Sequence, residues 1–155
     1  AFAELRGNIE TRLAKASQHA AVVVAAAALQ RLGIVPDPPA EVLDVTQLVP
    51  QVGQGVLAVE ARREDRSTIR MLADIDHLPT RLAITAERAF LAELGGDCDL
   101  PAGAHATVTA DRIDLHAVLA GPDGRLWHAR SRSHVAEWAG QAAAHDVQLL
   151  LGGAA

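Results

Sequence analysis

In the second half of the chain, the period of the hydrophobic pattern changes from helical spacing to alternation. One amphipathic helix without an internal proline is predicted by residues at helical spacing: Leu82, Ala86, Ala89, Phe90 and Leu94. Three later segments alternate apolar and polar side chains, as strands with one exposed face do: 104–108, 113–117 and 126–130. A last helix is expected from about residue 135 to 151. Residues 63–155 are therefore predicted to form a small α+β domain, an antiparallel three-stranded sheet with helices on one face.

The first part of the chain predicts a different arrangement. Short polar side chains precede the predicted helices and are expected to cap them: Asn8, Asp65 or Ser67, and Thr80. A helix over residues 26–32 is expected to end at Gly33. Residues 21–25 and 55–61 are apolar without alternation, which is typical of strands covered on both faces of a sheet. Residues 1–62 are therefore interpreted as part of an α/β domain.

Charge and cysteine content exclude several classes of protein. The net charge of -5 and the sequence pI of about 5.7 argue against a general nucleic-acid binder, which needs a basic face. A single cysteine precludes an internal disulfide and fits a reducing compartment. No apolar run reaches the roughly 18 residues of a membrane span, and no signal peptide is visible. We therefore expect a cytoplasmic protein with neither a membrane nor a nucleic acid as its partner.

Cys98 is expected on a tight loop between the predicted helix and the first predicted strand of the sheet. Gly95 and Gly96 precede it and reach backbone angles that other residues avoid, while Pro101 restricts the chain after it. A loop at such a junction can present a thiol to a cleft. The alternative is a small buried hydrophobic side chain, which free cysteine often is.

The surroundings of this loop resemble a known family. TAERAFL (85–91), GGDC (95–98) and PAGA (101–104) resemble the cofactor loop of hydroxymethylbilane synthases, also called porphobilinogen deaminases. Three further segments resemble the same family in the same order: LRGNIETRL (5–13), AALQRLG (27–33) and PQVGQGVLAVE (50–60). The resemblance runs from residue 5 to about residue 124, and more weakly to the end. It implies that residues 1–62 are part of a periplasmic-binding-protein-like α/β domain.

The resemblance also implies a reaction and its site. Enzymes of this family condense four porphobilinogen molecules head to tail, with release of ammonia, on a cysteine-linked dipyrromethane. By resemblance, Cys98 carries this cofactor through a thioether, and arginines and a loop bind the carboxylates of porphobilinogen and of the growing pyrrole chain: Arg6, Gly7, Asn8, Arg12 and Arg31. Guanidinium groups suit this role because they bind carboxylates through two hydrogen bonds and stay charged. Without the resemblance, these arginines are interpreted as solvated surface residues.

The sequence departs from the family pattern in places. Ala20 and Ala28 replace an aspartate and a glycine, and Asp97 and Asp99 flank the cysteine, where negative charge raises a thiol pKa. The family's catalytic aspartate lies in an N-terminal half without a counterpart in the printed sequence. We therefore expect this missing portion to be a partner and the chain alone to be inactive. Two alternatives stay open: a non-catalytic paralogue or stand-alone tetrapyrrole-binding module, and a generic α/β anion-binding fragment.

Other catalytic motifs give no signal. His105, His116 and His128 fall on the three predicted strands and can converge, but no close pair has metal-ligand spacing, so no metal site is expected. Phosphate-loop, dinucleotide and nucleophile-elbow patterns are absent from the sequence.

Overall fold

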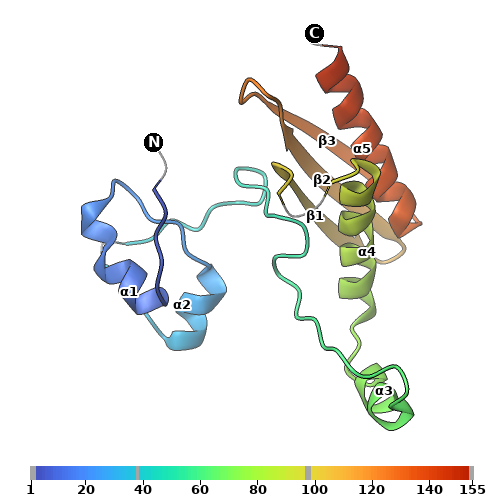
Figure 1. Cartoon of the computed structure of the whole chain (residues 1–155), viewed down its shortest axis with the longest axis horizontal. Helices are drawn as coiled ribbons and strands as arrows, with labels where there is room; N and C mark the ends of the chain where they lie inside the picture. Colours follow the sequence, from blue (N-terminus) through green and yellow to red (C-terminus); the bar gives the residue numbers. More distant parts are fainter. Residues whose placement is uncertain (1–2, 38, 97–98, 154–155) are drawn as a thin grey trace. The chain divides into compact units, whose positions relative to one another are not determined.

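The computed structural model describes residues 3–37, 39–96 and 99–153, and it divides the chain into two compact units. Unit 1, Ala1–Leu43, contains α1 (Ile9–Ala14), the 3-10 helix η1 (Ala16–Gln18) and α2 (Ala26–Leu32). Unit 2, Asp44–Ala155, contains the remaining elements: α3 (Arg66–Ala73), α4 (Leu78–Glu93), β1 (Ala102–Thr109), β2 (Arg112–Ala120), β3 (Leu126–Ser133) and α5 (Ala136–Gly152) (Figure 1). Among the residues described, no helix has both the length and the hydrophobicity needed to cross a membrane.

The short helices of unit 1 begin and end where their capping residues predict. Asn8 caps α1, because its Oδ1 accepts a hydrogen bond of 2.9 Å from the Thr11 amide. Gly33 ends α2 in the left-handed region, at φ +64°, and its amide donates to the Gln30 carbonyl. Both predicted caps are confirmed.

The strand predicted over residues 21–25 is wrong for this chain. These residues are irregular, and Val23 is 72% exposed. A strand needs a neighbouring strand to complete its backbone hydrogen bonds, and the described part of unit 1 contains none. The apolar composition of the segment therefore did not suffice to make it a strand.

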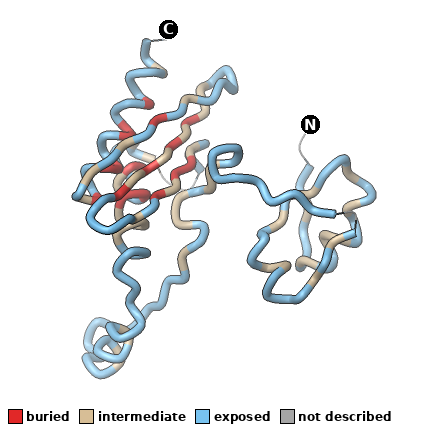
Figure 2. The backbone as a smooth tube through the Cα atoms, turned by 180° about the vertical axis from the view of Figure 1, so that it is seen from behind, coloured by how far each residue is buried: buried red, intermediate tan, exposed pale blue. Residues whose placement is uncertain are grey.

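Unit 2 is built on an antiparallel sheet with the order β1-β2-β3, and α4 and α5 lie against one face of it (Figure 1). This confirms the predicted three-stranded sheet with helices on one face. The register aligns Ala104, Ala117 and Ala129 in one buried row across the three strands. The core lies between the sheet and the two helices, as the buried positions in Figure 2 show.

Small residues allow α4 and α5 to approach each other closely. A Cβ atom on Gly140 of α5 would lie 2.2 Å from the Ala86 carbonyl oxygen and 2.6 Å from the Phe90 nitrogen, both on α4. Phe90 and Val147 are fully buried in the core to which both helices contribute. Because many of the residues are small, the two helices pack closely against each other. This close packing stabilises the core together with its large side chains.

Helices α3 and α4 begin at different kinds of cap. The Asp65 carboxylate accepts a hydrogen bond of 3.0 Å from the Thr68 amide, which confirms one of the two caps expected for α3. The cap expected at Thr80 is wrong, because α4 begins at Leu78 with His77 as its N-cap. Pro79 occupies the first turn, where its missing N–H costs no hydrogen bond, so the helix starts before Thr80.

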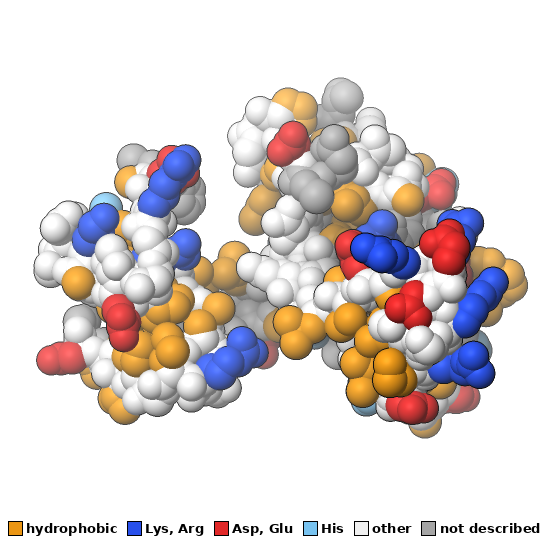
Figure 3. Space-filling view, turned by 60° about the horizontal axis from the view of Figure 1, so that its bottom comes forward, with side chains coloured by type: hydrophobic (Ala, Val, Ile, Leu, Met, Phe, Trp, Pro, Cys, Tyr) orange, Lys and Arg blue, Asp and Glu red, His pale blue; other side chains and the backbone are white. Residues whose placement is uncertain are grey.

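The second strand predicted in the first part of the sequence, over residues 55–61, is also irregular and the prediction is wrong for this chain. Leu57 is 87% exposed and Val59 is 61% exposed. Figure 3 shows hydrophobic side chains at the surface of the molecule. Neither side chain finds a covering sheet among the described elements.

The division between residues 43 and 44 precedes the boundary expected after residue 62. Residues 44–62 therefore belong to unit 2, and the Ala104 amide donates to the Pro50 carbonyl within this segment over 3.0 Å. The boundary after residue 62 stays a prediction about the complete protein.

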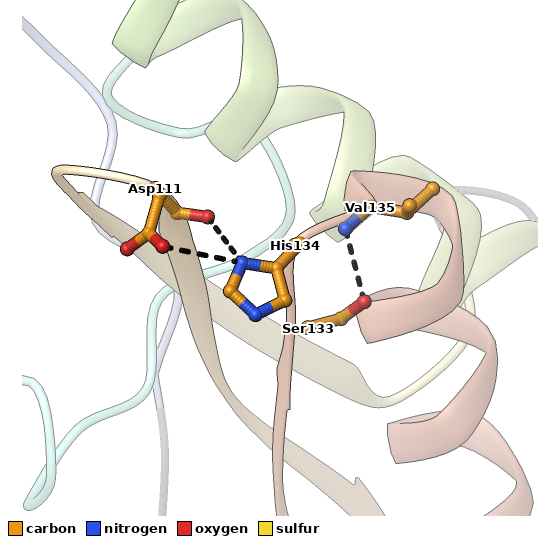
Figure 4. Close-up of polar contacts among 4 residues, drawn as sticks. All are labelled: Asp111, Ser133, His134 and Val135. Carbon is orange, nitrogen blue, oxygen red and sulfur yellow. Dashed lines mark hydrogen bonds and ion pairs between the residues drawn. The ribbon is translucent and has the colours of Figure 1, made fainter.

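The turn between β1 and β2 is tied to the start of α5. The His134 Nδ1 atom lies 2.8 Å from the Asp111 carbonyl oxygen and 3.6 Å from the Asp111 carboxylate (Figure 4). One residue later, the Val135 amide donates to the Ser133 hydroxyl oxygen over 3.0 Å. These contacts fix the angle at which the chain leaves β3 and enters α5.

Candidate functional site

The loop between α4 and β1 contains the predicted cofactor cysteine. Asp97 and Cys98 themselves lie outside the described residues. On the N-terminal side, Gly95 is left-handed, at φ +68°, and the Gly96 amide donates to the Leu91 carbonyl over 3.2 Å. This pattern ends a helix by satisfying its last carbonyl groups, so the chain enters the loop from a fixed point on α4.

The C-terminal side of the loop is bonded to the sheet. The Ala120 amide, at the end of β2, donates to the Pro101 carbonyl over 2.9 Å. A Cβ atom on Gly103 would lie 2.8 Å from the Pro50 carbonyl oxygen, so only glycine allows residue 50 to approach β1 this closely. Both ends of the cysteine loop are therefore anchored to regular structure.

A buried carboxylate joins three parts of this region. Glu87 is only 7% exposed, and its two carboxylate oxygens accept separate hydrogen bonds of 2.9 Å each. One donor is the Gly53 amide and the other is the Ala106 amide of β1. Charged acceptors make strong hydrogen bonds when they are buried, so Glu87 holds residue 53 and β1 against α4.

Glu87 was not among the residues that the sequence singled out. It belongs to the TAERAFL segment, and it lies on the same helix face as Ala83, Phe90 and Leu94. A carboxylate within an apolar stripe is the signal that identifies such a residue, because a buried charge needs donors around it.

The structure brings three predicted site residues together at the start of α1. Asn8 caps the helix, and the Nε atom of Arg12 donates a hydrogen bond of 2.8 Å to the Gly7 carbonyl. Gly7 has a φ of +128°, and a Cβ atom there would lie 2.7 Å from the Thr11 Cγ2 atom. Gly7 thus lets the chain turn tightly enough for Arg12 to reach back to it.

The other two arginines are placed more loosely. Arg6 is exposed, and its Nε and Nη2 atoms both lie 2.8 Å from Glu4 Oε1. An exposed ion pair of this kind contributes little stability, so a carboxylate ligand can displace Glu4 at small cost. Arg31 lies exposed in the last turn of α2. The arginines therefore belong to unit 1 and the cysteine loop belongs to unit 2.

The three strand histidines converge on the face of the sheet opposite to the helices. His105 is aligned with His116, and His116 Nε2 lies 3.2 Å from His128 Nδ1. Burial, and then the positive charge of Arg130, lower the pKa of His116. Within the described residues, no three histidine, cysteine or acidic side chains are arranged to hold a metal ion.

Comparison with known proteins identifies the family. Residues 1–70 match the family model "Porphobilinogen deaminase, dipyromethane cofactor binding domain", and residues 81–148 match "Porphobilinogen deaminase, C-terminal domain". The chain belongs to the porphobilinogen deaminase family. The first model contains the three predicted arginines, and the second contains Cys98 and Glu87.

Curated relatives named porphobilinogen deaminase agree with this placement. The protein of Roseiflexus sp. (strain RS-1) is 43% identical over 149 residues, which cover 95% of this chain and 49% of the relative. The protein of Coxiella burnetii (strain Dugway 5J108-111) is 44% identical over 125 residues, which cover 79% of this chain and 40% of the relative. The chain thus spans about half the length, or less, of these relatives.

Proposed function

We propose that this chain supplies the cofactor-carrying part of a porphobilinogen deaminase, or hydroxymethylbilane synthase. The whole enzyme condenses four porphobilinogen molecules head to tail and releases ammonia. The observation that carries this proposal is the succession of two porphobilinogen deaminase models along one chain, with the GGDC loop inside the second. A non-catalytic module is not favoured, since the curated relatives carry the enzyme's name.

The cofactor is proposed to be a dipyrromethane joined to Cys98 by a thioether. The name of the first family model supports the cofactor, and the anchored flanks of the loop support its attachment there. Cys98 is also the single thiol in the sequence. When bound, the cofactor supplies the pyrrole from which the product chain grows.

The arginines of unit 1 are proposed to bind the carboxylates of porphobilinogen and of the growing pyrrole chain. Arg6, Arg12 and Arg31 lie within the cofactor-binding model, and their guanidinium groups have the donor geometry that carboxylates require. The bond from Arg12 to the Gly7 carbonyl orients that guanidinium, so less entropy is lost when a carboxylate binds it.

The N-terminal portion of the complete protein is proposed as the partner of this chain. Two apolar segments, 21–25 and 55–61, have strand-like sequences but no strand partners among the described residues. We propose that they join sheets of a periplasmic-binding-protein-like α/β domain that the N-terminal portion completes, with a domain boundary after residue 62. The complete protein is proposed to be cytoplasmic.

Reconstitution tests the proposal. The 155-residue chain is produced alone, and also together with the N-terminal half of the Roseiflexus relative, in cells that make porphobilinogen. We expect the reconstituted pair to consume porphobilinogen and to give a positive reaction with Ehrlich's reagent, with the added mass located on Cys98. Cys98→Ser in the same pair is the control, and it is expected to lose the reaction with Ehrlich's reagent, the added mass and the consumption of porphobilinogen. An unmodified mass with a titratable thiol in an active pair would disprove the attachment of the cofactor to Cys98. A correctly folded pair without activity would contradict the proposal that the complete protein is a porphobilinogen deaminase.

A further inference from the structure

The face of the sheet opposite to the helices concentrates basic side chains. The register places His105, His116 and Arg130 in one row across β1, β2 and β3. His128 joins this row, since its Nδ1 atom lies 3.2 Å from His116 Nε2 and the ring centroids are 5.4 Å apart. Neighbouring strands are only about 4.8 Å apart, so these groups are direct neighbours.

The charges on this face do not balance. Within the three described strands, Asp114 is the one carboxylate, and it already forms an ion pair with Arg132. The row of His105, His116, His128 and Arg130 therefore has no acidic partner within the strands. When the histidines are protonated, like charges lie opposite each other, which destabilises a sheet. Protonation of this row therefore has an energetic cost, although the chain as a whole carries a net charge of -5.

A hollow of about 380 Å³ lies over this row. Its lining includes His105, His116, Arg130 and Arg132, together with the Thr107 hydroxyl group and the Asp114 carboxylate; the Thr46 hydroxyl also lines it but donates to Asp44. The Nδ1 atom of His116 is buried and finds no hydrogen-bond partner among the described residues. Guanidinium, imidazole and hydroxyl groups around one hollow form a set of donors for an anion.

We propose that this hollow binds a small oxyanion with at least two negative charges. Such an ion supplies the negative charge that the row lacks and accepts hydrogen bonds from the guanidinium and imidazole groups. Asp114 stays paired with Arg132 and sets the edge of the site.

Protonation of His116 regulates this site. The titratable and charged groups around His116 are His105 on β1, Asp114 on β2, and His128, Arg130 and Arg132 on β3. The segment that contributes Thr46 to the hollow adds Asp44, whose carboxylate accepts from the Thr46 hydroxyl. Burial and the neighbouring positive charges lower the pKa of His116, and a bound anion opposes this shift. Binding is therefore stronger at low pH than at high pH.

Sulfate is the first probe, because it carries two negative charges at both pH values compared; it is titrated into the ¹⁵N-labelled full chain at constant ionic strength. At about pH 6, we expect saturable shifts of amide and imidazole signals in the basic row, with a dissociation constant about tenfold lower than at about pH 8. Arg130→Gln, at an exposed position, is expected to weaken binding about tenfold, and His116→Gln is expected to abolish the pH dependence.

Arg70→Gln is the control, because it removes the same charge from the exposed surface of α3 and should leave binding unchanged. Chloride at the same ionic strength should give no saturable shift. Citrate in place of sulfate shows which oxyanion class the site prefers, and saturable binding of either one supports the proposal. Equal shifts with chloride, or equal affinities of Arg130→Gln and the unaltered chain, would overturn it.

Discussion

The carboxylate of Glu87 holds the amide of Gly53 at 2.9 Å, although 34 residues separate them in the sequence. Its second oxygen holds the Ala106 amide of β1 at the same distance. One buried side chain therefore connects α4, which leads into the cysteine loop, to the strand that follows the loop. It also binds the segment that precedes α3, so the supports of Cys98 form one connected unit.

Replacing Glu87 is expected to loosen this unit. Glu87→Gln retains one acceptor but presents an amide NH₂ to the other backbone N–H, at a cost of about 2 kcal/mol of unfolding free energy. Glu87→Ala leaves both buried amides without an acceptor and is expected to cost about 3 kcal/mol. Urea unfolding of the full chain measures both. Glu93→Gln, exposed at the end of the same helix, is the control, and equal losses in Glu93→Gln and Glu87→Gln would contradict the assignment.

Two glycines of α5 are expected to respond oppositely to alanine. Gly140→Ala places a methyl group 2.2 Å from the Ala86 carbonyl oxygen, so the two helices must separate. We expect a loss of about 1–3 kcal/mol of unfolding free energy. Gly152→Ala adds a methyl group with no neighbour within 4 Å and is expected to stabilise the helix by about 0.5 kcal/mol. Thermal unfolding distinguishes them, and a neutral Gly140→Ala would show that the helices do not cross as described.

Arg12 is expected to bind carboxylates through two hydrogen bonds from its guanidinium group and not through its charge alone. In the complete protein, Arg12→Lys keeps the charge but loses the bond from Nε to the Gly7 carbonyl. We expect pyrrole-chain binding to weaken by about 1.5–3 kcal/mol, with little change in folding. Lys15→Gln removes a charge next to the same helix and should have a smaller effect. A larger effect of Lys15→Gln on the affinity would indicate simple charge attraction.

His116 is expected to make the stability of unit 2 depend on pH. Its pKa in the folded chain lies below the ordinary value of 6.5, chiefly because of burial. The unfolded chain therefore binds more protons than the folded chain as the pH falls below 6.5, so the free energy of unfolding decreases there. Chemical denaturation in buffers without multivalent anions measures the slope. His116→Gln should flatten it, whereas His145→Gln, at an exposed position of α5, should flatten it less.

Asp65 is expected to hold the start of α3 until strongly acidic pH. Hydrogen bonds from Thr68, and then from Ser67, lower the pKa of Asp65 to about 2. Because the folded pKa is depressed, the cap is fully present above pH 3.8 and is lost as the pH falls through about 2. NMR signals of the first turn of α3 should follow this titration. Asp65→Asn keeps a capping oxygen and should remove the titration, and a midpoint near 3.8 in the unaltered chain would refute the capping bonds.

The sequence alone determined the architecture of the second half of this protein. The change from helical spacing to alternation predicted α4, the three strands and α5, because each element there buries its own apolar face against its neighbours. Residues near the helix ends predicted the caps at Asn8 and Gly33 and gave Asp65 as one of two candidates for α3, since capping depends on side chains a few residues away; the cap predicted at Thr80 was wrong. Hydrophobic periodicity and helix caps depend on residues that are close together in the sequence, so they can be predicted from it.

The tertiary structure decided what depends on distant partners. The apolar segments 21–25 and 55–61 did not become strands in this chain, because a strand requires a second strand, which its own sequence does not provide. Likewise, the two hydrogen bonds that Glu87 accepts from backbone amides follow from helix packing, and the alignment of His105, His116 and Arg130 follows from strand register. These relationships join residues far apart in the sequence, so only the folded chain specifies them.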